Sequence, residues 1–197
     1  MTLVALLCLA TAVAQPADAR RPAGASPLAA QREAMAAFRA LDGQWRGTAW
    51  VLTPGGRQTL VQTERAGPLL DGTVRVVEGA GYLENGTRVF HALGVISYDP
   101  QRRTYRIATT AQGQTGTFAI RPTSDGYVWE TPGRPGETIR YTAHFQGPAW
   151  TEYGERIGAD GTILRIFEMR LTRVGETGWP GEGQVPPQGS APAADRP

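Results

Sequence analysis

From residue 44 onward, apolar and polar residues alternate along most of the chain. The clearest run is 138–146, whose alternate apolar positions are Ile139, Tyr141, Ala143 and Phe145. A period of two residues is typical of a β-strand with one buried face. The pattern therefore predicts strands rather than helices for the greater part of the chain.

Turn sequences separate these alternating runs into about ten segments. Asn85-Gly86 favours a tight hairpin, and Asp125-Gly126 and Asp160-Gly161 are similar turn signals. The segments are 45–52, 57–65, 72–83, 87–98, 104–110, 115–121, 126–131, 138–146, 149–157 and 162–174. None of the connections is long enough for a crossover helix, so neighbouring strands must pair antiparallel.

Closing such a meander into a ring removes its two exposed edges. The sequence therefore predicts an all-β fold, an antiparallel up-and-down β-barrel of about ten strands. A barrel of this size has an interior wider than side chains alone fill, so we expect a cavity.

One helix is expected before the first strand. Residues 27–41 are rich in alanine, and Leu28, Met35 and Phe38 recur at helical spacing. Ser26 followed by Pro27 is typical of a helix N-terminus, and Asp42-Gly43 ends the pattern. The prediction is one N-terminal amphipathic helix.

The two ends of the chain differ from the barrel sequence in composition. Residues 1–14 contain a short apolar run ending in Ala-Val-Ala, which is typical of a bacterial signal peptide and too short to span a bilayer. Residues 15–26 read as a linker, 27–174 as the helix and barrel domain, and 175–197 as a disordered Pro/Gly-rich tail. We expect a periplasmic or secreted protein without stable membrane insertion, and Cys8 would be removed with the signal peptide.

Charge argues against a nucleic-acid partner. All 20 basic residues are arginine, the net charge is only +2, and the arginines are scattered along the chain. Nucleic-acid binding favours a clustered basic face. The sequence makes no prediction about oligomeric state.

The opening of the first strand resembles that of known barrels. Gly43-Gln44-Trp45 follows a helix and precedes a meander, as in the calycin superfamily of lipocalins, fatty-acid-binding proteins and nitrobindins. The longer stretch LDGQWRGTAW, residues 41–50, is similar to the nitrobindin opening. In lipocalins the Trp of this motif lies across the barrel floor against an arginine of the last strand, which implies a partnership of Trp45 with Arg170 or Arg173.

Residues 41–187 also resemble a bacterial family of secreted proteins that carries only a domain-of-unknown-function label. The shared features are the LDGQWRG opening, the YDP turn at 98–100, WTEYGERIGADGT at 150–162, and WPGEGQVPP at 179–187. This resemblance implies a lipocalin-like barrel and secretion, and it implies no particular activity.

The leading functional prediction is non-catalytic binding of a small apolar molecule inside the barrel, with no cofactor. There is no Gly-x-Ser-x-Gly motif, the two histidines are far apart in sequence, and Glu152 and Glu155 fall on opposite faces of one strand. A catalytic or metal site is therefore not predicted. The candidate ligand-binding residues are Tyr82, Phe90, Tyr141, Phe145, Phe167 and Glu168.

Three alternatives stay open. The resemblance to nitrobindins implies haem bound through a late-strand histidine, for which His144 is the candidate; alternation, however, places His144 on the polar face, so we expect it to point to solvent. The other histidine, His91, alternates with Val89 and Leu93 and is expected in the core. The remaining alternatives are a lyase or isomerase acting in the barrel, and an envelope interaction protein with a filled barrel.

Overall fold

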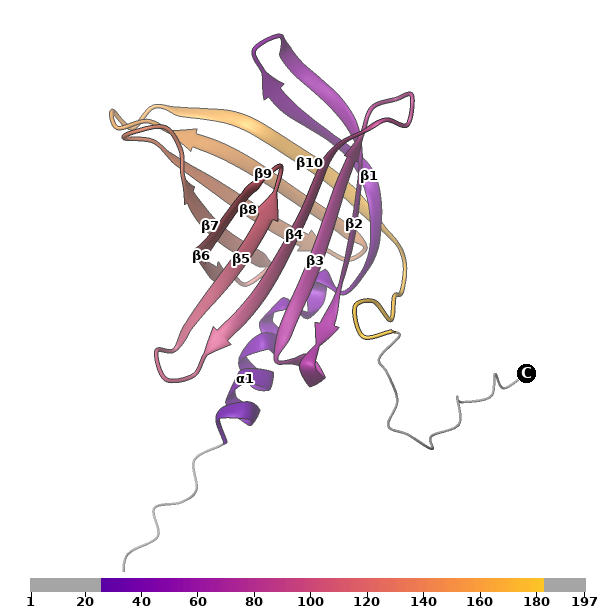
Figure 1. The fold of residues 1–197 in the computed structure, drawn as a ribbon, viewed down its shortest axis with the longest axis vertical. Coiled ribbons are helices and arrows are strands. Elements are labelled where there is room, and N and C mark those ends of the chain that lie inside the picture. Colours follow the sequence, from indigo (N-terminus) through magenta and orange to yellow (C-terminus); the bar gives the residue numbers. More distant parts are fainter. Residues whose placement is uncertain (1–25, 183–197) are drawn as a thin grey trace, which may run out of the picture.

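The computed structural model describes residues 26–182 of the chain (Figure 1). The predicted signal peptide at 1–14 and nearly all of the predicted linker at 15–26 lie outside these residues. So does the segment 183–197, which is most of the predicted tail. The described residues form a short helical segment followed by ten strands.

The ten strands form one closed antiparallel barrel (Figure 1). Each strand pairs with its neighbours in sequence, and β1 also pairs with β10, so none of the described strands is left at an edge. The strands are β1 (Gly43–Thr53), β2 (Gly56–Leu69), β3 (Val74–Tyr82), β4 (Arg88–Asp99), β5 (Thr104–Ala111), β6 (Gln114–Pro122), β7 (Gly126–Pro132), β8 (Thr138–Gln146), β9 (Ala149–Ile157) and β10 (Ile163–Gly175). The predicted all-β, up-and-down barrel is confirmed.

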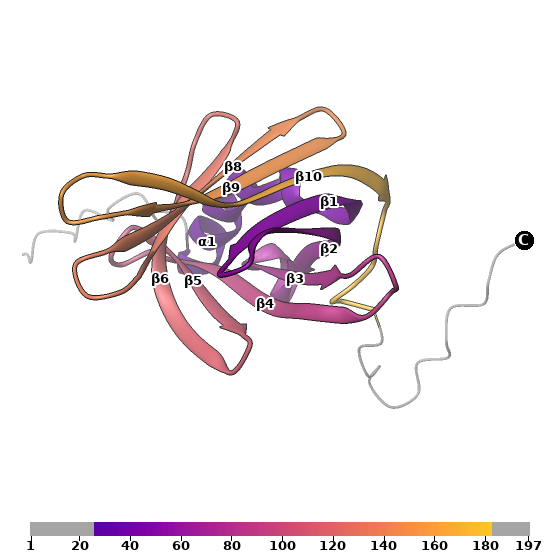
Figure 2. The same cartoon turned by 90° about the horizontal axis from the view of Figure 1, so that it is seen from above.

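The N-terminal helix covers one end of the barrel. It consists of α1 (Pro27–Met35) and a tighter 3-10 segment, η1 (Ala36–Leu41), rather than one regular helix. The Ser26 hydroxyl accepts a hydrogen bond from the backbone N–H of Ala29 and caps the helix. In the view from above, α1 lies across the ring of strands (Figure 2). We call the end covered by α1 and η1 the closed end.

Two hydrogen bonds connect α1 to β4 and β5. The Gln31 amide donates to the backbone carbonyl of Tyr98, and the Tyr105 hydroxyl donates to the carbonyl of Ala34. The buried apolar side chains of the helical segment are Met35, Phe38 and Leu41. The helix therefore seals the barrel with apolar side chains that point inward.

Trp45 packs at the closed end, where the Gly-x-Trp resemblance places it. Its indole N–H donates to the carbonyl of Leu41 at 2.8 Å, and its ring packs edge-on against Trp150. Arg173 is the cross-strand neighbour of Trp45. The Arg173 guanidinium, however, donates to the backbone carbonyl of Asp42. Arg173 thus fixes the junction between η1 and β1.

An ion pair with a buried arginine lies at the closed end. Nε of Arg75 is 2.8 Å from Oδ1 of Asp42, and the Arg75 side chain is 5% exposed. Burial raises the pKa of Asp42, and the neighbouring Arg75 charge opposes that rise. Each buried charge here has a partner of opposite sign.

The described structure continues past the predicted domain boundary at residue 174. Gly175 ends β10, and the Trp179 ring lies under the guanidinium of Arg65, 4.4 Å from it. The near end of the predicted tail is therefore packed on the outside of the barrel as far as residue 182. Within residues 26–182, no helix is both long enough and apolar enough to cross a membrane.

Candidate functional site

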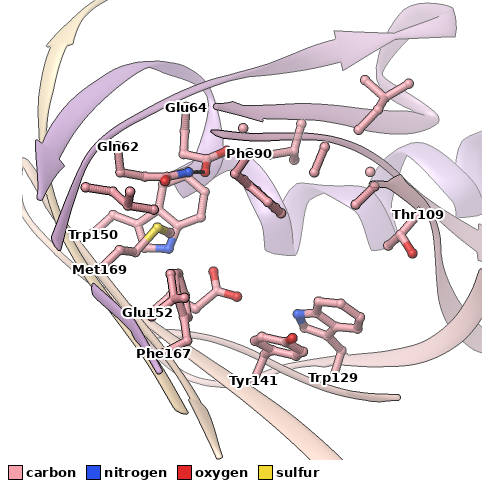
Figure 3. Close-up of a pocket in the computed structure, with 18 of the residues that line it drawn as sticks. Gln62, Glu64, Phe90, Thr109, Trp129, Tyr141, Trp150, Glu152, Phe167 and Met169 are labelled. Atoms are coloured by element: carbon pink, nitrogen blue, oxygen red, sulfur yellow. Dashed lines mark hydrogen bonds between the residues drawn. The ribbon is translucent and has the colours of Figure 1, made fainter. Parts of the chain in front are cut away.

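A cavity of about 540 Å³ lies inside the barrel (Figure 3). Most of its wall is aliphatic or aromatic and comes from the inner faces of the strands, with Val77, Ile96, Ile107 and Met169 among the aliphatic residues. Small-molecule sites commonly have volumes of roughly 300–1,000 Å³. The cavity is therefore large enough for a small ligand.

Aromatic rings form much of the wall. Trp129 on β7 and Tyr141 on β8 are stacked, with ring centroids 4.4 Å apart and planes 14° apart. Phe167 on β10 meets Tyr141 edge-on, and Phe90 on β4 lies across the cavity from them (Figure 3). These rings offer flat apolar surfaces to a ligand.

Two polar side chains enter the cavity from β2. The Gln62 amide donates to Oε1 of Glu64 at 2.7 Å. Gly79 and Gly81 of β3 lie directly opposite Glu64 and Gln62. A Cβ at Gly79 would come within 2.5 Å of Oε1 of Glu64, so glycine at this position leaves the space that the carboxyl group occupies.

A second carboxyl group enters from β9. The Tyr127 hydroxyl donates to Oε2 of Glu152 at 2.6 Å, and Glu152 is 7% exposed. Beside it, Trp150 is 1% exposed and lines the same cavity. Its indole N–H has no hydrogen-bond partner among residues 26–182. Glu152 is thus held by Tyr127, and an unused donor lies next to it.

The surroundings make both carboxyl groups weak acids. Burial raises the pKa of Glu64 to about 8; the hydrogen bond from Gln62 opposes this rise, and the charge of Glu152 adds to it. Burial also raises the pKa of Glu152, against the hydrogen bond from Tyr127. Among the described residues that line the cavity, none is arginine or histidine. The site is acidic and holds no cation of its own.

The structure divides the six predicted ligand-binding residues into three groups. Phe90, Tyr141 and Phe167 line the cavity. Phe145 points inward but packs at the closed end against the rings of Trp45 and Trp150.

The remaining two do not line the cavity. Glu168 lies on the outer face, between the inward-facing Phe167 and Met169, and it forms an ion pair with Arg170. Tyr82 follows a register shift in β3 and pairs with the exposed Val61. Glu168 points outward because adjacent residues of a strand face opposite sides of the sheet, and Tyr82 lies at the register shift that ends the inner row of β3.

Neither histidine faces the cavity. Nδ1 of His144 lies 2.8 Å from Oδ2 of Asp125, and the His144 side chain is 43% exposed. His91 is exposed as well and pairs with Glu78, so the expectation of a core histidine was wrong. With His144 turned outward, the residues present do not fit a haem held in the cavity through a histidine.

In the part of the chain that is described, no group of three or more His, Cys, Asp or Glu side chains could hold a metal ion.

The sequence reading overlooked the polar residues of the cavity. Gln62 and Glu64 share the inner face of β2 with Leu60 and Ala66, because the four residues occupy every second position of the strand. Glu152 shares the inner face of β9 with Trp150. Two signals could have located them. The first is this alternation with buried residues, and the second is the Gly-Ala-Gly sequence at 79–81, which leaves room opposite β2.

The fold and the cavity define a class of protein, a closed ten-stranded antiparallel barrel with an internal space of ligand size. No protein-family model matches the chain, and no curated protein does. A similar solved structure is the crystal structure of Rv2717c from M. tuberculosis, with a TM-score of 0.54 and 11% sequence identity. The similarity covers 72% of this chain and 97% of that chain, and at this identity it shows a shared fold.

Proposed function

We propose that this protein is a calycin-like barrel that binds a small, largely apolar molecule in its cavity without catalysis. The observation that carries the proposal is the cavity of about 540 Å³ with its aromatic and aliphatic wall. Removing apolar surface from water contributes about 25 cal/mol per Å². A ligand that covers this wall therefore gains affinity from burial alone.

The position of Trp45 supports the calycin-like part of the proposal. Trp45 follows the helix, lies at the closed end and is hydrogen-bonded to Leu41, as the resemblance of Gly43-Gln44-Trp45 implies. A periplasmic or secreted location belongs to the same proposal. It is supported by the apolar run at residues 3–14, which lies outside the described residues.

The ligand is expected to enter from the end opposite α1. The cavity wall includes Val51, Leu52 and Gln58, which flank the β1–β2 hairpin at that end (Figure 1). The closed end is occupied by the helical segment and its buried side chains. A ligand therefore has one route that does not require the helix to move.

Binding of N-phenyl-1-naphthylamine, a fluorescent apolar probe that is uncharged at neutral pH, tests the proposal. We expect saturable binding with one site per chain. Ala92→Trp fills part of the cavity and should weaken binding at least tenfold, because Ala92 lines it. Ala119→Trp is the matched control, since Ala119 is exposed on the outer face of β6. Absence of binding, or equal affinity in the two variants, would show the proposal to be wrong.

A further inference from the structure

The cavity contains two carboxyl groups and no cation to balance them. Glu64 from β2 and Glu152 from β9 both point into it (Figure 3). They are close enough for the charge of Glu152 to raise the pKa of Glu64. On the outer face the pattern differs, because Glu78, Glu155 and Glu168 each pair with an arginine.

Buried carboxylates are costly unless a positive charge or several hydrogen-bond donors compensate them. Inside this cavity Glu64 receives one hydrogen bond from Gln62. Glu152 receives one from Tyr127, and the indole N–H groups of Trp129 and Trp150 also lie close enough to lower its pKa. A carboxylate can accept about four. Both groups therefore keep free acceptor positions that face the cavity.

Trp150 provides a second observation at this corner of the cavity. Its indole N–H is fully buried in the cavity wall and meets the geometry of a hydrogen bond with no residue of the described structure. The N–H lies close enough to Glu152 to lower the pKa of that carboxyl group, but it is not well aligned with it. An oxygen atom of a bound molecule would satisfy this donor.

We propose that the cavity selects a small molecule with a protonated amine at one end and an apolar body, with the ammonium group bound between Glu64 and Glu152. An ammonium carries three N–H donors and a positive charge, which match the free acceptor positions of the two carboxylates. This inference rests on the proposed function, because it names the ligand class of the same cavity.

The aromatic wall suits the same ligand. Trp129 directs the N–H edge of its indole toward Glu152 and is stacked on Tyr141 (Figure 3). The two stacked rings therefore lie next to the proposed amine position and offer apolar surface to the adjoining part of the ligand. The apolar body would then cover the aliphatic surface toward the end opposite α1.

Binding of an amine should release a proton. With its pKa at about 8, Glu64 is mostly protonated at neutral pH, and an incoming ammonium favours its ionised form. The proton passes to solvent, and the affinity for a cation therefore rises as the pH is raised toward 8. The other titratable groups that line the cavity are Glu152, Tyr127 and Tyr141.

Three ligands with the same indole ring test the inference by calorimetry on the full chain at pH 8: tryptamine, which is a cation, tryptophol, which is neutral, and indole-3-acetate, which is an anion. We expect tryptamine to bind at least tenfold more tightly than tryptophol, and indole-3-acetate not to bind. Glu64→Gln and Glu152→Gln should each lower the affinity for tryptamine at least tenfold and change the affinity for tryptophol by less than twofold. Glu168→Gln, on the outer face, is the control and should change neither affinity.

A second measurement uses the unaltered protein and does not depend on the folding of any variant. Calorimetry at pH 7 in buffers of different ionisation enthalpy should show proton release with tryptamine and none with tryptophol. Equal affinities for tryptamine and tryptophol, or no released proton, would overturn the amine inference. In that case binding of N-phenyl-1-naphthylamine would still support the proposed function, whereas failure of all these ligands to bind would refute both.

Discussion

The closed end and the cavity both bury charged groups, but they treat them differently. At the closed end Asp42 lies against Arg75 at 2.8 Å. In the cavity, Glu64 and Glu152 have neutral hydrogen-bond partners, and the charge of Glu152 helps to raise the pKa of Glu64. The difference separates a charge pair that stabilises the fold from a pair of acids that the fold alone does not require.

The packing of side chains also differs between the closed end and the cavity. Met35, Phe38 and Leu41 are at most 1% exposed and fill the closed end. The rings of Phe90 and Tyr141 keep accessible surface because they border the cavity. The barrel is thus filled at one end and hollow beyond it, and we expect stability to depend on the first region and binding on the second.

The largest effect on stability is expected from Trp45→Ala. Removing this buried ring leaves a hole at the closed end and breaks a hydrogen bond, with a loss of about 4 kcal/mol in the free energy of unfolding. Phe90→Ala is the comparison in the cavity wall and should lose less than half as much, because its ring already borders empty space. Urea unfolding measures both, and similar losses would contradict the distinction between the two regions.

A smaller effect is expected from Glu64→Gln, and it depends on pH. The folded-state pKa of about 8 lies above the ordinary value of 4.5, so between these values the folded protein binds more protons than the unfolded chain. The stability that protonated Glu64 allows is therefore fully present below about pH 4.5 and is lost as the pH rises toward 8.

Glutamine does not titrate. Between pH 4 and pH 7 the free energy of unfolding of the wild type should therefore fall by roughly 3 kcal/mol more than that of Glu64→Gln. Unfolding curves across this range provide the measurement. Glu168→Gln, outside the barrel, serves as control and should follow the wild type. Parallel curves for wild type and Glu64→Gln would show that Glu64 is not the weak acid described above.

The smallest of the three effects is expected from Arg75→Met. It leaves Asp42 without its counter-ion, and because Asp42 keeps 29% of its side-chain surface exposed, we expect a loss of about 2 kcal/mol. The double variant Arg75→Met/Asp42→Asn removes both charges and should recover most of that loss in thermal unfolding. If the double variant is no more stable than the single one, Arg75 does not stabilise the closed end by compensating the charge of Asp42.

The alternation of residues predicted the barrel well, because period-two patterning and short turns leave a meander few ways to fold. The same argument found Phe90, Tyr141 and Phe167. It failed for Glu168, because Glu168 and its neighbour Phe167 were both predicted to line the cavity, although adjacent residues of a strand point to opposite faces. β10 also has a register shift between Arg165 and Phe167. Local irregularities of this kind depend on the partner strand, which one sequence does not reveal.

The polar site was harder to predict, since its parts come from distant strands. The room for the Glu64 carboxyl group becomes evident when Glu64 is paired with Gly79 across β2 and β3. Glu152 was weighed against Glu155 on its own strand, whereas its partners Tyr127 and Glu64 lie on other strands. The residue pattern of one strand predicts which side chains share a face. To predict a site made by several strands, the register between those strands must also be known.

The pairing of β1 with β10 also determines when the acidic site forms during folding. Glu64 on β2 and Glu152 on β9 are separated in the ring only by β1 and β10. That pairing brings Gln44 near Gly175, and contacts between such distant residues form slowly because the intervening chain must first lose its entropy. We therefore expect the two carboxyl groups to come together in the step that closes the ring, and their protonation to affect how fast the barrel is completed as well as how stable it is.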